Sequence, residues 1–218
     1  MNKMLNLANT ITISRIVILY LTVVMIYTQE VIWLSAGVIF SIAIIIMDAL
    51  DGYVARRRNE VTQFGGVLDI TGDRIVENVY WIVFADLDLI PMWIPIIVMS
   101  RGFLTDAIRS QALTEGKTAF GENTMMSSDV GKFLVSGRFM RAFYGVIKGV
   151  TFPYLILVLL AKEKHLIEAD LTDYLWISSY AQQTGLFLAI TTTVVSVIRG
   201  IPVLAEGKRL FVKDNQAG

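Results

Sequence analysis

The sequence lacks several residues on which enzymes and soluble domains commonly depend. It contains no cysteine and a single histidine, His165. Disulfides, zinc-thiolate sites and cysteine nucleophiles are therefore excluded, and a His-rich metal site or a Ser-His triad is disfavoured. Charged residues make up 17% of the chain, against about a quarter in an ordinary soluble domain. Basic and acidic residues balance at 19 each, so no basic excess indicates a nucleic-acid partner.

Apolar residues, in contrast, are abundant: 55% of the 218 positions are hydrophobic and the mean hydropathy is +0.60. A helix needs about 20 mainly apolar residues to cross the hydrocarbon core of a bilayer. Six stretches meet this requirement, at residues 11–27, 32–54, 67–85, 90–113, 131–161 and 174–204. We therefore expect an all-α, polytopic membrane protein with six transmembrane helices in one domain over residues 1–218. The first stretch is expected to be a retained helix, because Arg15 interrupts its start and no small-x-small cleavage site follows.

The distribution of basic residues predicts the orientation in the membrane. With six spans, both termini lie on the same side as the loops that follow the second and fourth stretches. These segments carry most of the loop cations, including Arg56-Arg57-Arg58 and, in the tail, Lys208, Arg209 and Lys213. The positive-inside rule therefore places both termini in the cytoplasm, at the inner membrane of the cell.

Four aspartates form the most informative pattern in the chain. Asp48 and Asp51 are three residues apart, and Asp69 and Asp73 are four apart, so each pair lies on one face of a helix. A short loop between the second and third stretches makes these helices antiparallel neighbours. The two pairs are then expected to face each other near the cytoplasmic ends of the helices.

Such a cluster is costly in an apolar chain. One aspartate at membrane depth costs roughly 2.5–3.5 kcal/mol on insertion scales, and four carboxylates also repel one another. Hard divalent cations with oxygen ligands, Mg²⁺ or Mn²⁺, would make the cluster tolerable. Two such ions could bridge a diphosphate and neutralise a leaving group. The sequence therefore predicts a metal site of Asp48, Asp51, Asp69 and Asp73.

Small residues accompany the aspartates at regular offsets. Gly52, Ala55 and Gly65 leave room for a nucleotide to lie against the backbone, and Arg56 lies one turn beyond Gly52, where it can pair with a phosphate. We predict that these four residues bind the nucleotide part of a substrate.

The complete pattern, D-x2-D-G-x2-A-R-x8-G-x3-D-x3-D, resembles that of the CDP-alcohol phosphatidyltransferases and is matched at every position. Asn9-Thr-Ile-Thr12-x-x-Arg15 also resembles the start of the first helix in that family, with Ala8 in place of proline. The resemblance implies a homodimer, a CDP-linked lipid such as CDP-diacylglycerol as donor, and release of CMP. It further implies that Asp73 is the general base that deprotonates the acceptor hydroxyl. The lipid could be diacylglycerol-based or an ether lipid.

Basic residues inside the apolar stretches point to the acceptor, because cations at membrane depth are functional candidates. Several of them imply an anionic acceptor such as glycerol 3-phosphate or inositol phosphate. The segments around Arg101, Arg109 and Lys132 resemble those of phosphatidylglycerophosphate synthases, although Gly102 replaces a glutamate and Arg74-Ile-Val-Glu77 is closer to inositol phosphate enzymes. We predict Arg101, Arg109, Lys132 and Arg141 as acceptor-binding residues. Phosphatidylglycerol and serine remain alternative acceptors.

Two other classes of membrane protein compete with this interpretation. A membrane prenyltransferase also uses aspartate pairs and Mg²⁺ on a diphosphate, but its motifs lie on separated helices. A transporter or channel requires polar residues through the full membrane depth, whereas here they gather on the cytoplasmic side. The short turn that joins the two aspartate pairs disfavours the prenyltransferase, and the cytoplasmic position of the polar residues disfavours the transporter or channel.

Overall fold

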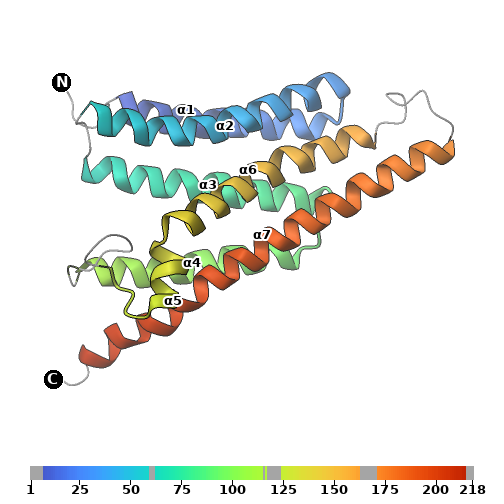
Figure 1. The fold of residues 1–218 in the computed structure, drawn as a ribbon. Coiled ribbons are helices and arrows are strands. Elements are labelled where there is room, and N and C mark those ends of the chain that lie inside the picture. The colour runs from blue at the N-terminus through green and yellow to red at the C-terminus, as the bar shows by residue number, and fades with distance from the viewer. Residues whose placement is uncertain (1–6, 59–61, 115, 117–123, 163–170, 215–218) are drawn as a thin grey trace. The chain divides into compact units, whose positions relative to one another are not determined.

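The computed structural model of the protein describes residues 7–58, 62–114, 116, 124–162 and 171–214. Its elements are helical, in agreement with the predicted fold class. They are α1 (Leu7–Thr28), α2 (Val31–Arg57), α3 (Gln63–Asp86), α4 (Trp93–Thr114), the single turn α5 (Asp129–Gly131), the π-helical turn η1 (Lys132–Ser136), α6 (Arg138–Ala161) and α7 (Leu171–Asp214). Figure 1 shows their order along the chain.

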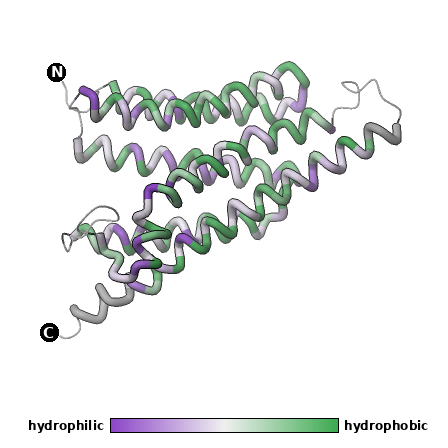
Figure 2. Tube along the Cα trace, viewed as in Figure 1, coloured by the Kyte–Doolittle hydropathy of each residue, from purple (hydrophilic) through white to green (hydrophobic). Residues whose placement is uncertain are grey.

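Four of these helices contain segments that are long and apolar enough to cross a membrane: Leu7–Thr28, Val31–Ala55, Arg138–Ala161 and Leu175–Gly207. They coincide with four of the six predicted spans. Figure 2 shows the apolar residues along them. The predicted stretches 67–85 and 90–113 lie in α3 and α4, which are 24 and 22 residues long but carry several charged side chains each. The protein is therefore an integral membrane protein with at least four candidate spans in its described part.

The predicted fifth stretch, residues 131–161, is not one continuous helix. It is divided at Gly137, which has the extended conformation φ −60°, ψ 131° between η1 and α6. The amide of Arg141 then donates to the carbonyl of Gly137, and the apolar helix begins at Arg138. The first residues of this stretch, with Lys132, therefore belong to the separate turns α5 and η1, whereas Arg138, Arg141 and Lys148 lie on α6.

The chain divides into two compact units, and α6 and α7 each contribute a segment to both. The first unit contains Met1–Pro91 and Gly149–Phe187. Within it, α1 and α2 lie side by side and α3 runs along them (Figure 1). Its core contains an aromatic group in which Tyr80 stacks on Phe84 with ring centroids 5.5 Å apart, and Phe152 of α6 meets Trp81 edge-on at 5.2 Å. This packing holds α3 against the chain that follows Gly149.

The second unit contains Met92–Lys148 and Leu188–Gly218. A small apolar core joins α4, the segment before α5, η1 and α7, through Ala112, Met125, Met126, Val135 and Val203. At the same place the carboxylate of Glu206 on α7 accepts hydrogen bonds from Ser127 and Ser128. Ser128 in turn caps α5 by accepting from the amide of Gly131. The polar contacts therefore hold the turns before α6 against α7.

Candidate functional site

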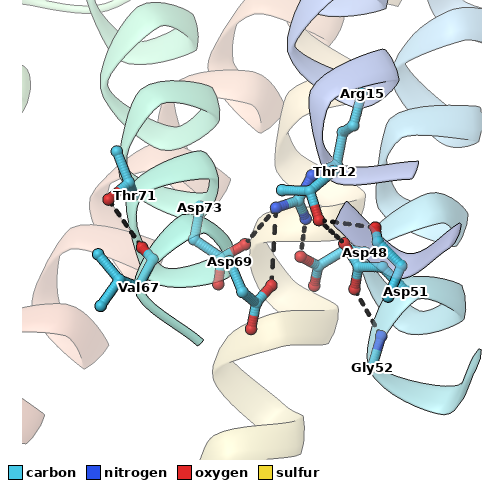
Figure 3. Close-up of polar contacts among 10 residues, drawn as sticks. Thr12, Arg15, Asp48, Asp51, Gly52, Val67, Asp69, Thr71 and Asp73 are labelled. Carbon is cyan, nitrogen blue, oxygen red and sulfur yellow. Dashed lines mark hydrogen bonds and ion pairs between the residues drawn. The ribbon is translucent and has the colours of Figure 1, made fainter. Parts of the chain in front are cut away.

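Three aspartates converge in the first unit. One carboxylate oxygen from each of Asp48, Asp69 and Asp73 lies within 4.8 Å of the others. Asp48 comes from α2 and the other two from α3, so the prediction that the two aspartate pairs face each other is confirmed for these residues (Figure 3). Their side chains are 47–49% exposed, which leaves carboxylate oxygens accessible from one side. We refer to Asp48, Asp69 and Asp73 as the aspartate triad.

Asp51 lies beside the triad in a different environment. It is buried, with 4% of its surface exposed. One carboxylate oxygen accepts a hydrogen bond from the hydroxyl of Thr12 at 3.0 Å, and the other accepts from the amide of Gly52 at 2.6 Å. These bonds satisfy part of the acceptor capacity of the carboxylate and hold its orientation (Figure 3).

A cation from α1 lies between the aspartates of α2 and those of α3. Nη1 of Arg15 pairs with Oδ1 of Asp48, while Nη2 lies 3.1 Å from Asp73 and 3.9 Å from Asp69. The Arg15 side chain is only 2% exposed, so it approaches the triad from the buried side (Figure 3). A buried guanidinium of this kind requires anionic partners, and the triad provides three.

In the sequence, Thr12 and Arg15 are marked by their resemblance to a family motif, and Arg15 also by its charge inside an apolar stretch, but no partner was predicted for either. The available signal was their spacing: Asn9, Thr12 and Arg15 recur every three residues in an otherwise apolar helix, and all three are buried. A polar stripe on one face of an apolar helix predicts polar partners on its neighbours. For Thr12 and Arg15, those partners are the aspartates of α2 and α3.

Two glycines allow α1 and α3 to approach at this place. A Cβ atom on Gly72 would lie 2.9 Å from Nη2 of Arg15 and 3.0 Å from the methyl group of Thr12. A Cβ on Gly65 would lie 2.8 Å from Oδ1 of Asn9. All three distances are shorter than ordinary van der Waals contacts, so a side chain at either position would displace side-chain atoms of α1.

A pocket of about 320 Å³ opens next to Asp51 and Asp69. Its size is within the range of small-molecule sites. Its lining includes three of the four residues predicted to bind the nucleotide, Gly52, Ala55 and Gly65, together with Asn9 and Thr12. The side chain of Arg56, the fourth, lies outside the described side chains. At the start of α3 the hydroxyl of Thr62 caps the helix by accepting from the amide of Gly65, 3.0 Å away.

The donor set of the triad fits a hard divalent cation. It offers carboxylate oxygens alone, close enough to converge on one ion, and Mg²⁺ and Mn²⁺ prefer such ligands. The half-exposed carboxylates leave a side of the triad from which a metal ion can enter. Asp48, Asp69 and Asp73 are therefore the residues that could hold a metal. Asp51, the fourth predicted ligand, lies outside this converging set and lines the neighbouring pocket together with Asp69.

A group of cations surrounds one buried tyrosine in the second unit. Lys148 Nζ lies 4.8 Å from the centroid of the Tyr144 ring, and the guanidinium carbons of Arg199 and Arg101 lie 5.0 and 5.8 Å away. Arg101 also donates to the hydroxyls of Tyr144, at 3.2 Å, and Ser196. We refer to these five residues, Arg101, Tyr144, Lys148, Ser196 and Arg199, as the Tyr144 group.

Three cations around one ring repel one another, and the ring quadrupole offsets only part of that cost. Nε of Arg101 is buried and has no hydrogen-bond partner among the described residues. Arg199 donates from Nε to the carbonyl of Leu134 at 3.1 Å. An anion that accepted from these donors would lower the energy of the whole group.

The other predicted acceptor residues have different surroundings. Arg109 forms an ion pair with Asp106, 3.6 Å away and one turn earlier on α4. Lys132, on η1, and Arg141, on α6, are exposed. Lys148 and Arg199 are also cations within apolar stretches, but they were not among the residues predicted to bind the acceptor. Their aromatic partner, Tyr144, gave no separate signal in the sequence.

Comparison with known proteins places the chain among membrane transferases. The sequence model of the CDP-alcohol phosphatidyltransferase family matches residues 5–198. The proteins named CDP-diacylglycerol–glycerol-3-phosphate 3-phosphatidyltransferase from Bacillus subtilis (strain 168) and Rickettsia bellii (strain RML369-C) are each 31% identical to it, over 119 and 107 residues. The protein of that name from Rickettsia typhi is 28% identical over 106 residues. These matches cover 48–49% of this chain and 61%, 58% and 60% of the three relatives, in that order.

Proposed function

Because the chain belongs to the CDP-alcohol phosphatidyltransferase family, we propose that it transfers a phosphatidyl group from CDP-diacylglycerol to the hydroxyl of glycerol 3-phosphate. The observation that carries the proposal is the convergence of the aspartate triad beside a glycine-lined pocket, on the residues that match the family pattern. The names of the relatives support glycerol 3-phosphate as acceptor. The product would be phosphatidylglycerophosphate, an intermediate of phospholipid biosynthesis.

The donor is proposed to bind with its nucleotide in the pocket beside Asp51. Gly52, Ala55 and Gly65 present backbone rather than bulky side chains there. Arg56 follows Ala55 on α2 and is proposed to pair with a phosphate of the donor. The diphosphate would then lie against the aspartates, an arrangement that requires cations between the two sets of negative charge.

Asp48, Asp51, Asp69 and Asp73 are proposed to hold divalent cations, and two Mg²⁺ or Mn²⁺ ions suit four carboxylate ligands.

 When bound, such ions would neutralise the diphosphate and make CMP a better leaving group. Asp73 is proposed as the general base, and its oxygen then takes the proton of the acceptor hydroxyl. The acceptor oxygen bonds to the β-phosphorus of the donor, and the bond from that phosphorus to the oxygen of CMP breaks, so that CMP leaves with the electron pair.

The acceptor phosphate is proposed to bind at the Tyr144 group. Arg101 carries this assignment, since its buried Nε has no hydrogen-bond partner among the described residues and Arg199 and Lys148 lie around the same ring. Arg109, Lys132 and Arg141 are proposed as further contacts of the acceptor. A cationic group of this kind favours a phosphorylated alcohol over a neutral one, and inositol phosphate is the second candidate acceptor.

The number of membrane spans and their orientation are proposed from the helices and their loops. We propose that α3 and α4 also cross the membrane, giving six spans, because their length suffices and their charged side chains can face the interior of the protein. Both termini and the aspartates are proposed to face the cytoplasm, as the loop cations favour. A homodimer is proposed from the family resemblance.

The test is release of CMP by the purified full chain in detergent or nanodiscs. The protein is mixed with CDP-diacylglycerol, Mg²⁺ or Mn²⁺, and one of glycerol 3-phosphate, inositol phosphate, phosphatidylglycerol, serine or inositol. We expect CMP and phosphatidylglycerophosphate, identified by mass spectrometry, with glycerol 3-phosphate. Release with another acceptor alone would keep the reaction class and replace the acceptor. If no CMP is released with any of these acceptors in the presence of metal, the proposed function is contradicted.

A further inference from the structure

Arg15 is distinguished from the other cations of the first unit by its position inside the aspartate triad. It is 1% exposed, and its guanidinium contacts aspartates of two different helices. The hydrogen bonds it makes are incomplete, because Nε and Nη2 have no hydrogen-bond partner among the described residues. Its contacts with Asp69 and Asp73 are therefore mainly electrostatic, at 3.9 and 3.1 Å.

Arg15 has little room to withdraw from the triad. The backbone of Gly72 lies so close that a Cβ there would be 2.9 Å from Nη2. Thr12, one turn earlier on α1, is itself held by its hydrogen bond to Asp51. The positive charge of Arg15 is thus confined next to the same oxygens that would ligate a metal ion.

We propose that Arg15 is a built-in counter-cation that competes with the divalent metal for the aspartate triad. This inference rests on the metal site of the proposed function and adds a residue to it. Without a metal ion, Arg15 limits the repulsion between three carboxylates whose oxygens lie within 4.8 Å. With a metal ion, the same fixed charge repels the incoming cation, so Arg15 stabilises the fold and weakens metal binding.

A purely positioning role predicts the opposite sign. If Arg15 only oriented the carboxylates for the metal, its removal would scatter the ligands and weaken metal binding. If it competes, removal of its charge strengthens metal binding while the protein without metal becomes less stable. Metal affinity therefore separates the two roles without reference to turnover.

The experiment measures Mn²⁺ binding by electron paramagnetic resonance on the full chain in detergent, with no substrate present. Arg15→Met removes the charge and retains much of the side-chain volume. We expect it to bind Mn²⁺ about tenfold more tightly than the wild type, because a unit charge a few ångströms away interacts strongly with a divalent ion. The apparent Tm of Arg15→Met in EDTA should fall below that of the wild type. Saturating Mn²⁺ should raise the Tm of the variant by more than it raises the Tm of the wild type. Arg15→Lys keeps the charge and should bind Mn²⁺ nearly as the wild type does.

Arg57→Met is the matched control. Arg57 lies on α2, the helix that carries Asp48 of the triad, but it is exposed and donates to the hydroxyl of Tyr53. Its removal should change the Kd for Mn²⁺ by less than about twofold, because exposed charges are screened. If Arg15→Met cannot be purified in folded form, Arg15→Gln removes the same charge, and the same tighter binding is expected.

The outcomes distinguish this inference from the proposed function. Equal or weaker Mn²⁺ binding by the neutral Arg15 variants, with normal binding by the wild type, would overturn the competition and leave the metal site intact. A Tm in EDTA that is the same for Arg15→Met and the wild type would also overturn the proposed competition. If wild type and variants alike bind no Mn²⁺ while CMP is released without metal, the metal site itself is wrong and both fail.

Discussion

The aspartate triad and the Tyr144 group are assembled in different ways. The triad and Asp51 come from a single helical hairpin, within 26 residues of sequence. Spacings of three and four residues place the two aspartates of each helix on one face. The Tyr144 group draws on α4, α6 and α7, and its cations span residues 101 to 199. The first charge set is anionic and half-exposed, whereas the second is cationic and arranged around a buried ring. Local spacing thus encodes the proposed donor site, while the proposed acceptor site depends on tertiary packing.

The first way to test this comparison is Asp73→Asn, which has the largest expected effect. The amide cannot take a proton from the acceptor hydroxyl, so kcat should fall by about 10²–10⁴-fold. Binding of CDP to the pocket should persist, because the variant retains Gly52, Ala55 and Gly65. Rapid kinetics of CMP release and a CDP binding titration measure the two properties. A variant with wild-type turnover would remove Asp73 as the base.

Arg101→Ala tests the second region. Loss of a charge-assisted hydrogen bond of about 1.5–3 kcal/mol should raise the KM for glycerol 3-phosphate by roughly ten- to a hundredfold. The KM for CDP-diacylglycerol should stay near its wild-type value, since Arg101 belongs to the proposed acceptor site. Arg109→Ala, on the same helix, should raise this KM by less, because Arg109 already pairs with Asp106. Equal changes in the two variants would contradict the special position of Arg101.

The same contrast explains how much of the molecule could be predicted from its sequence. The aspartates, the glycines around them and the helical fold class followed from spacing and hydropathy, because both are local properties of a helix. The contacts of Arg101 with Tyr144 and Ser196 join residues 43 and 95 positions apart, and no periodic pattern reports such distances. The contacts of Arg15 with Asp48 and Asp73 were not predicted for the same reason, although its helix shows a polar stripe.

The division of the fifth stretch at Gly137 shows a second limit of sequence analysis. Hydropathy averages over many residues and does not locate a single extended residue between two helical segments. The carbonyl of Phe133 lies where a Cβ on residue 137 would stand, so the chain turns sharply there. The apolar content of 138–161 was predicted correctly, but the boundary depended on this backbone contact.

Gly72→Ala tests how closely α1 must approach the hairpin that carries the triad. The new methyl group would lie 2.9 Å from Nη2 of Arg15, which is enclosed and cannot move freely. We expect a loss of about 1–3 kcal/mol of stability, as for other overpacked positions, seen as a lower apparent Tm in detergent. Gly66→Ala is the control on the same helix, because a Cβ placed there would have no atom of a neighbouring helix within 4 Å. Its Tm should be equal or slightly higher, since alanine favours the helix. Equal Tm values for both variants would contradict the close packing of Arg15.

Glu206→Gln has the smallest expected effect and probes the second unit away from its cations. The carboxylate of Glu206 accepts from the hydroxyls of both Ser127 and Ser128, and thereby joins α7 to the turn before α5. The amide keeps one acceptor oxygen but weakens these bonds, because a charged acceptor is stronger than a neutral one. We expect the free energy of unfolding to fall by about 1 kcal/mol, with a small fall in apparent Tm.

The same variant also probes the separation of the donor and acceptor regions. The KM for CDP-diacylglycerol should not change, whereas the KM for glycerol 3-phosphate should rise slightly if Lys132, four residues beyond Ser128, contacts the acceptor. Glu30→Gln, at an exposed position of the first unit, is the control and should leave both KM values unaltered. A change in the donor KM alone would contradict the assignment of separate donor and acceptor regions.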